Sequence, residues 1–119
     1  MDKIAKMALL ADFYGPLLTE KQQNVWDLHY QQDLSLAEIA EAEHISRQAI
    51  YDLLKRTERI LAEYEEKLGL VQRFWTERLK LAQVQALLQE FDEQDFASDP
   101  ARERYQKVSA MIEDLFLNI

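Results

Sequence analysis

The sequence contains no cysteine, only two glycines and two prolines, and no long uncharged apolar run. Without cysteine the chain has neither a disulfide framework nor a thiolate metal site, which fits a reducing cytoplasm. No apolar segment approaches the roughly 18 residues needed to span a bilayer. The N-terminal segment also lacks the basic-then-apolar layout of a secretory signal. We therefore expect a cytoplasmic protein that does not insert into membranes.

Motifs typical of enzymes are lacking as well. The sequence has no glycine-rich phosphate loop, no nucleophile elbow and no HExxH metal motif. The two histidines, His29 and His44, are far apart in the sequence, and we interpret them as surface or turn residues rather than as metal ligands. The sequence thus predicts a protein that is not an enzyme and holds no cofactor and no metal.

Cations are few compared with acids, since 14 Lys and Arg residues face 22 Asp and Glu residues for a formal net charge of −8. Affinity for nucleic acid begins with neutralisation of phosphates, so this net charge disfavours indiscriminate binding to polyanions. Whether a local positive patch exists depends on where the charges lie along the chain.

The residues that are present predict an all-α fold. Hydrophobic residues make up 48% of the 119 positions, and the scarcity of glycine and proline favours helices joined by short turns. Apolar residues at steps of three and four, with capping boxes at Thr19 and Ser35 and a further cap at Ser46, mark the helices. The predicted helices cover residues 3–14, 19–30, a short stretch from Ser35, 46–68 before Gly69, 70–91, and the segment from an Asp99 cap with Pro100 in the first helical position.

The last two predicted helices form the C-terminal part of the chain. Their apolar stripes are Phe74, Leu81, Val84, Leu88 and Phe91, and then Tyr105, Val108, Ile112, Leu115 and Ile119. Two such helices in succession predict an antiparallel hairpin. We expect a first domain over residues 1–69 and a helical extension over residues 70–119 for dimerisation or partner docking. Trp26 is predicted in the core, whereas Trp75, with Phe74 and Leu70, is either an exposed apolar edge or packed against the last helix.

A helix-turn-helix pattern lies between Ser35 and Arg56. It needs a small residue where two helices cross, apolar anchors on the first helix and in the turn, a cap, and apolar residues on the second helix. The sequence supplies these as Ala40, Leu36, Ile39, Ile45, Ser46, Ala49 and Ile50. In this motif the start of the second helix reaches base edges and flanking cations meet phosphates. The candidate nucleic-acid-binding residues are Arg47, Gln48, Tyr51, Lys55, Arg56 and Arg59.

Two stretches of the chain resemble known proteins. Residues 17–61, "LLTEKQQNVWDLHYQQDLSLAEIAEAEHISRQAIYDLLKRTERIL", resemble region 4 of bacterial sigma factors. The run from "DFYGPLLTEKQ" through "SRQAIYDLLKRTERILAEYEEKLGL" resembles the YlxM family, and the match covers roughly residues 1–75. YlxM proteins are small bacterial helix-turn-helix proteins whose genes lie beside those of the signal recognition particle. The resemblance implies an all-helical cytoplasmic protein that acts with, or regulates, that particle.

One departure from the pattern concerns the turn, where many helix-turn-helix units have Leu-Gly and this chain has Glu43-His44. Histidine adopts a positive φ less readily than glycine, and Glu43 removes an apolar anchor. We expect a turn that is looser than usual.

The positive charge around the second helix is local. Residues 46–59 hold four cations and two acids, for a net charge of +2, between segments 32–45 and 60–69 with net charges of −4 and −2. The alternative interpretation of the cations is a solvated helix face with intrahelical pairs such as Asp52 with Arg56.

Two hypotheses follow. The first is a dimeric regulator that binds DNA or the RNA of the signal recognition particle. The second is an adaptor that binds a protein component of that particle without contacting nucleic acid.

Overall fold

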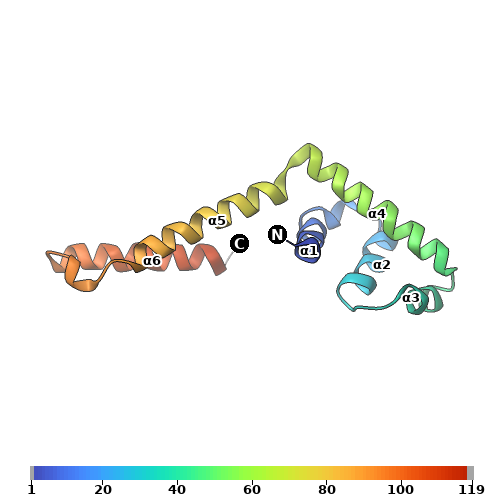
Figure 1. Ribbon diagram of the computed structural model, residues 1–119, viewed down its shortest axis with the longest axis horizontal. Coiled ribbons are helices and arrows are strands. Elements are labelled where there is room, and N and C mark those ends of the chain that lie inside the picture. Colours follow the sequence, from blue (N-terminus) through green and yellow to red (C-terminus); the bar gives the residue numbers. More distant parts are fainter. Residues whose placement is uncertain (1, 118–119) are drawn as a thin grey trace. The chain divides into compact units, whose positions relative to one another are not determined.

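In the computed structural model, which describes residues 2–117, the chain consists of α-helices joined by short turns (Figure 1). The elements within those residues are α1 (Lys3–Tyr14), a 3₁₀ turn η1 (Gly15–Leu17), α2 (Glu20–Tyr30), α3 (Leu36–Glu43), α4 (Arg47–Leu68), α5 (Leu70–Gln89), a 3₁₀ turn η2 (Glu93–Asp95) and α6 (Asp99–Leu117). The predicted all-α class is confirmed. The chain divides into two compact units, Met1–Gln72 and Arg73–Ile119.

The predicted caps of α2, α3 and α4 are present. The Thr19 hydroxyl accepts a hydrogen bond from the Gln22 amide at 3.2 Å, and the Gln22 side chain accepts one from the Thr19 amide at 2.9 Å. Ser35 and Glu38 form the same reciprocal pair at the start of α3. The Ser46 hydroxyl accepts from the amide three residues later at 3.0 Å. Each cap satisfies an amide that has no partner inside its helix.

Glycine and proline end two of the helices. Gly15 and Pro16 stop α1 and form the 3₁₀ turn η1. Gly69 ends α4 with a φ of +62°, and its amide donates to the Glu65 carbonyl at 2.8 Å. A positive φ costs glycine less than any other residue, so the break between α4 and α5 follows directly from the sequence.

The first unit has a continuous apolar core. Helix α4 packs against α1, α2 and α3, and the side chains it buries against them include Ile50, Leu54 and Leu61. Trp26 is only 1% exposed, which confirms its predicted core position. Each fully buried large apolar side chain stabilises the fold by about 1.5–3 kcal/mol. Val71, in the first turn of α5, also belongs to this core.

A polar network fixes the start of α5 within the first unit. The buried Tyr14 hydroxyl donates to a Glu65 carboxylate oxygen at 2.6 Å and accepts from the Leu70 amide at 3.1 Å. The Glu65 carboxylate also accepts from the amides of Val71 at 3.0 Å and Gln72 at 2.9 Å. A carboxylate is favoured there because the first amides of a helix have no internal partners and the helix dipole is positive.

The same contacts shift the ionisation of both side chains. Burial raises the pKa of the Glu65 carboxyl, but the hydrogen bonds from Tyr14 and from the two amides outweigh it, so the pKa lies below its ordinary value. Burial, together with the hydrogen bond to Glu65, raises the pKa of Tyr14. The network therefore holds Glu65 charged and Tyr14 neutral.

In the second unit α5 and α6 run antiparallel (Figure 1). The Tyr105 hydroxyl donates to the Leu88 carbonyl at 2.8 Å, and the Arg78 guanidinium lies 5.4 Å from the centre of the Phe116 ring. These pairs set the register, because the residue number rises along one helix as it falls along the other. The predicted hairpin is present.

The apolar stripes predicted for this hairpin separate into two groups. Phe74, Leu81, Leu88, Tyr105 and Ile112 are half-buried, whereas Val84, Phe91, Val108 and Leu115 are exposed. Ile119, the last residue of the second predicted stripe, lies outside the described residues. Trp75 is half-buried, and Leu70, in the first unit, is exposed.

The predicted Asp99 cap is wrong, because Ser98 caps α6. The Ser98 hydroxyl accepts from the Ala101 amide at 3.4 Å, and its carbonyl accepts from the Arg102 amide at 3.2 Å. Asp99 is already helical, and its carboxylate accepts from the Arg102 guanidinium at 3.1 Å.

Candidate nucleic-acid interface

The helix-turn-helix consists of α3, a short turn and the first part of α4. Ile39, Ala40 and Ile50 are buried at the crossing of the two helices. Leu36 and Ile45 are partly buried against the same core. The predicted anchors therefore occupy the positions that the motif requires, and they fix the orientation of α4 on α3.

The turn is closed rather than loose. His44 adopts the left-handed conformation, with a φ of +58° and a ψ of +36°. The His44 amide donates to the Glu41 carbonyl at 3.4 Å and the Ile45 amide donates to the Ala40 carbonyl at 3.2 Å. This pair of bonds is a Schellman motif, which ends a helix firmly. The expectation of a looser turn is wrong, because the backbone bonds that close it do not depend on a glycine.

Glu43, the other unusual residue of the turn, has a polar partner in place of an apolar one. The Asn24 amide of α2 donates to its carboxylate at 3.1 Å. The second histidine, His29, donates from Nδ1 to the Leu34 carbonyl at 3.0 Å. His44 thus supplies the left-handed residue of the turn, and His29 hydrogen-bonds the backbone of the link between α2 and α3.

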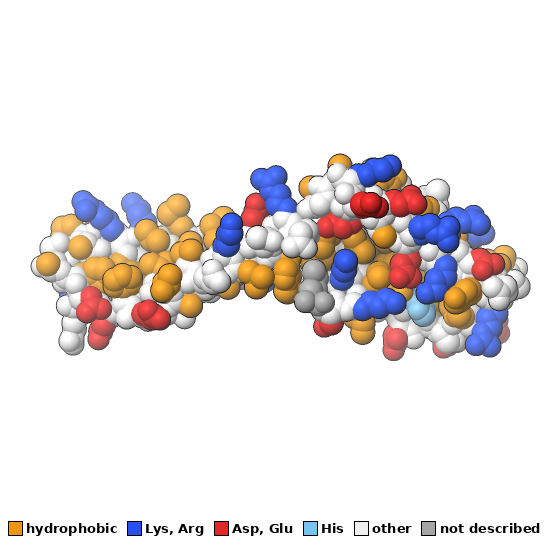
Figure 2. Space-filling model, turned by 45° about the horizontal axis from the view of Figure 1, so that its top comes forward, with side chains coloured by type: hydrophobic (Ala, Val, Ile, Leu, Met, Phe, Trp, Pro, Cys, Tyr) orange, Lys and Arg blue, Asp and Glu red, His pale blue; other side chains and the backbone are white. Residues whose placement is uncertain are grey.

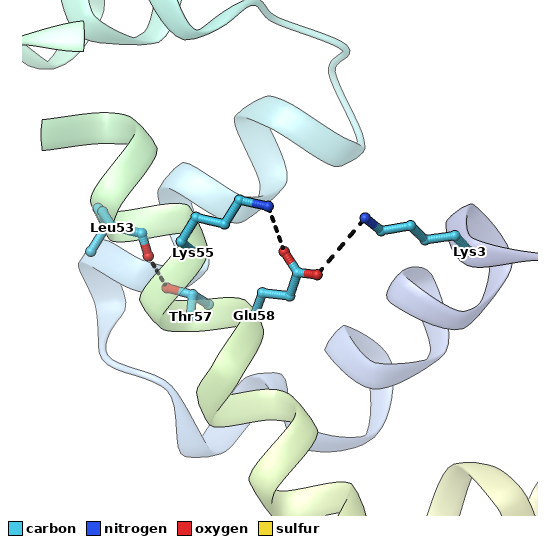
Figure 3. Close-up of polar contacts among 5 residues, drawn as sticks. All are labelled: Lys3, Leu53, Lys55, Thr57 and Glu58. Atoms are coloured by element: carbon cyan, nitrogen blue, oxygen red, sulfur yellow. Dashed lines mark hydrogen bonds and ion pairs between the residues drawn. The ribbon is translucent and has the colours of Figure 1, made fainter. Parts of the chain in front are cut away.

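The buried side of α4 is firmly held. Thr57 is a buried polar residue, and its hydroxyl donates to the Leu53 carbonyl one turn earlier at 2.8 Å, as Figure 3 shows. Its hydrogen-bonding need is thereby met within the helix. The opposite face of α4 is left for solvent or for a ligand.

All six candidate residues are exposed on α4. An α-helix advances about 100° per residue, so the six spread over about half of its circumference, from Arg47 at the edge of the buried side, seven residues before Leu54, to Arg56 nearly opposite it. They extend over more than three turns, and they are Arg47, Gln48, Tyr51, Lys55, Arg56 and Arg59. The structure thus leaves all six exposed along one helix.

Three of the six have partners on the same helix. The Gln48 amide donates to the Asp52 carboxylate at 3.0 Å. The Lys55 ammonium lies 3.7 Å from a Glu58 oxygen and 5.7 Å from the centre of the Tyr51 ring. Lys55 is therefore partly neutralised.

The three arginines of the set have none. Within residues 2–117, Arg47, Arg56 and Arg59 make no hydrogen bond or ion pair with another side chain, and the pair of Asp52 with Arg56 suggested by their spacing does not form. Asp52 accepts from Gln48 instead. Figure 2 shows the Lys and Arg side chains of the first unit interspersed with Asp and Glu rather than gathered into one continuous patch. Among the described residues of this face, these three guanidinium groups are the cations without an acidic partner.

One cation near this face is not evident from the sequence. Lys3 of α1 lies 3.9 Å from Glu58, so that Glu58 stands between Lys3 and Lys55 (Figure 3). Tyr30 of α2 lies near the same charges: burial raises its pKa, Glu58 adds to the rise and Lys55 opposes it. Residues about 50 positions apart meet here only through the packing of α1 and α2 on α4, and no short-range pattern signals that.

Comparison with known sequences identifies the family. Residues 1–108 match the profile of UPF0122, a family of helix-turn-helix proteins described as "YlxM / p13 like". The chain belongs to the UPF0122 family. The predicted YlxM resemblance is confirmed, and it extends well beyond residue 75 to include most of the C-terminal hairpin.

Individual members of the family are close in sequence. A UPF0122 protein of Desulforamulus reducens is 51% identical over 92 residues, which are 77% of this chain and 79% of that protein. One of Shouchella clausii is 44% identical over 115 residues, 97% of this chain and 98% of its own length. One of Bacillus cereus strain AH187 is 49% identical over 90 residues, 76% of this chain and 82% of the relative.

The family is one of helix-turn-helix proteins. No helix within residues 2–117 is long and apolar enough to cross a membrane.

Proposed function

We propose that this UPF0122 protein is a non-enzymatic, cytoplasmic helix-turn-helix regulator that binds nucleic acid through the exposed face of α4. The ligand is duplex DNA or the structured RNA of the signal recognition particle. The observation that supports this most directly is the set of unpaired guanidinium groups of Arg47, Arg56 and Arg59 on the second helix of the motif.

The positions of the residues suggest their roles. Arg47 and Gln48 occupy the first turn of α4, the part of the second helix that reaches base edges in helix-turn-helix complexes. Lys55, Arg56 and Arg59 lie further along and would meet phosphates. Tyr51 is between the two groups, and its exposed ring is available to stack on a base or a sugar.

The expected affinity is modest and depends strongly on salt. Each phosphate neutralised contributes about −0.9 to the slope of log affinity against log salt on duplex DNA. Three phosphate contacts, from Lys55, Arg56 and Arg59, therefore predict a loss of about 40-fold in affinity between 50 and 200 mM salt. The acids on either side of the cations limit longer-range steering, because charges are screened over about 8 Å at physiological salt.

The test is a double charge reversal, Arg47→Glu with Arg56→Glu, compared with Lys21→Glu with Lys67→Glu. Both pairs change the net charge equally and replace exposed side chains of the first unit, but only the first pair lies in the proposed interface. Binding to random duplex DNA and to signal recognition particle RNA is measured by fluorescence anisotropy at low salt. We expect the first variant to lose binding at least about 100-fold and the second to change it less than about 5-fold. Equal losses, or no binding by the unaltered protein to either probe, would exclude the proposal.

The competing proposal is a protein-binding adaptor that engages a basic component of the signal recognition particle. The observation that favours it is the exposed acids Asp33, Glu38 and Glu41 next to the cationic face, together with a net charge of −8. An adaptor would retain its protein partner in a pull-down when Arg47 and Arg56 are reversed. It would lose that partner when the three acids are replaced by their amides.

A further inference from the structure

The second unit lacks a buried core of its own. No side chain that the structure describes between residues 73 and 117 is buried, and the one buried residue of α5, Val71, belongs to the first unit. The unit is also short, and units below about 70 residues commonly add cross-links, a metal or oligomerisation to a small core. Two helices in contact bury one seam and leave their flanks in water.

The flanks of this hairpin are not equivalent. The half-buried positions that face the other helix include Gln85 and Leu88 on α5 and Ser109 and Ile112 on α6. Consider the residue that directly precedes a position facing the other helix. In an antiparallel pair, such residues on both helices lie on the same side of the plane through the two helix axes, because both helices are right-handed. One side of the hairpin can therefore be identified from the sequence numbers alone.

That side carries six apolar residues, which we call the apolar face, together with the charged Lys80 and Arg104, which precede the half-buried Leu81 and Tyr105. The apolar face consists of Val84, Leu87 and Phe91 on α5 and Val108, Met111 and Leu115 on α6, which are 43–63% exposed. None of the six is charged. Figure 2 shows hydrophobic side chains gathered along this unit. The opposite side is mixed, since Gln89, Gln106 and Glu113 are found there beside Leu79.

The area of the apolar face matches what a stable interface needs. A fully exposed aromatic side chain presents roughly 150–250 Å² and an aliphatic one less, so six side chains that are about half exposed present at most about 600 Å². That lies at the upper limit of the largest apolar patch on an ordinary monomer. Two such faces in contact would bury up to about 1,200 Å², which reaches the lower end of the range for specific interfaces.

We propose that a second copy of this chain covers the apolar face, so that two hairpins form a four-helix bundle around a two-fold axis. A two-fold contact places the same patch on both sides, and the six uncharged side chains tolerate this without like-charge repulsion. Four helices then enclose the six residues of each copy as a bundle core. The proposal does not depend on nucleic-acid binding.

The association should respond to salt in the opposite way to nucleic-acid binding. The second unit has six cations and nine acids, a net charge of −3, so two copies repel each other weakly outside the apolar face. Added salt screens that repulsion, and burial of apolar surface is not weakened by it. We expect the dissociation constant of the dimer to stay constant or to fall between 50 and 500 mM salt.

The test is the mass of the whole chain in solution, measured by sedimentation equilibrium without nucleic acid. The unaltered protein should have a mass of about 28 kDa, twice the 14.1 kDa of one chain. Leu87→Glu with Met111→Glu places charges in the apolar face and should raise the dissociation constant at least roughly 100-fold, to a mass near one chain. Both side chains are more than half exposed in one copy, so the first unit should keep its structure.

The matched control is Leu79→Glu with Leu117→Glu. It makes the same chemical change on the same two helices, at exposed positions on the opposite side. This variant should remain a dimer. A monomeric unaltered protein at about 100 µM, or dissociation of the control but not of the apolar-face variant, would overturn the proposal. If the unaltered chain is monomeric, a different protein covers the face.

Discussion

The two units of this chain differ in how completely their helices bury apolar side chains. In the first, α4 lies against three helices, and residues such as Leu61 and Trp26 are almost wholly removed from water. In the second, two helices meet along a single seam, and residues of equal hydrophobicity, such as Leu87 and Met111, are left more than half exposed. The comparison shows that an apolar stripe stabilises a unit only when enough neighbouring elements are present to cover it.

The largest expected effect comes from the same substitution in both units. Leu61→Ala removes a side chain that is 0% exposed and should lower the free energy of unfolding by about 2–5 kcal/mol. Leu87 is 61% exposed, and at concentrations where the chain is monomeric Leu87→Ala should cost less than about 0.5 kcal/mol. Urea unfolding followed by circular dichroism measures both. Equal losses at low concentration would show that the second unit has a core of its own.

A tyrosine in each unit provides the next comparison. Tyr14→Phe removes the hydroxyl that bonds to Glu65 and to the Leu70 amide, in a buried position, and should cost about 1–3 kcal/mol. Tyr105→Phe removes one hydrogen bond to the Leu88 carbonyl in a half-buried position, where water can replace it, so the loss should be below about 1 kcal/mol. Thermal unfolding of the two variants at equal concentration tests the order.

The same network predicts a dependence on pH. The folded-state pKa of Glu65 is lowered, so its contribution to stability is complete above the unfolded value of about 4.3 and is lost as pH falls through the lower folded value. Tyr14→Phe removes one cause of that shift and should make the unfolding free energy less dependent on pH below about 4.3. Measurements between pH 6 and pH 3 check the difference in slope. An unchanged slope would mean that Glu65 titrates in the same way with and without Tyr14.

The smallest effect is expected at the helix-turn-helix turn. His44→Gly removes the Cβ that makes a positive φ unfavourable, but glycine loses more chain entropy on folding. The net result should be a rise in the free energy of unfolding of the first unit by roughly 0.5 kcal/mol. His44→Ala keeps the Cβ and removes the ring, so it should not stabilise. A rise in melting temperature for the alanine variant as well would assign the effect to the imidazole rather than to the backbone.

The helix starts and the breaks between helices were predictable because their causes are short-range. Thr19, Ser35 and Ser46 cap helices through bonds to amides three residues later, and Gly69 ends α4 through its own backbone freedom. Ser98 displaced the predicted Asp99 because adjacent residues can both cap, and only the backbone geometry selects between them. The exposure of the six candidate residues was likewise evident from helical spacing.

Side-chain pairing was less predictable. The spacing of Asp52 and Arg56 allows an ion pair, but Asp52 accepts from Gln48 instead. No sequence interval connects Lys3 with Glu58, or Tyr14 with Glu65, because those contacts arise when separate helices pack. Which arginines remain unpaired, and hence which are available to a phosphate, depends on that packing.

The sequence by itself determined the helices, the helix-turn-helix pattern and the family, since each rests on local patterns of capping, spacing and residue type. Only the tertiary structure decided which apolar residues are covered. Val84 and Leu88 belong to one predicted stripe, yet Leu88 faces α6 and Val84 faces solvent. The reason is geometric: hydrophobicity favours burial of every apolar residue, but the number and direction of neighbouring helices decide how many of them can be buried.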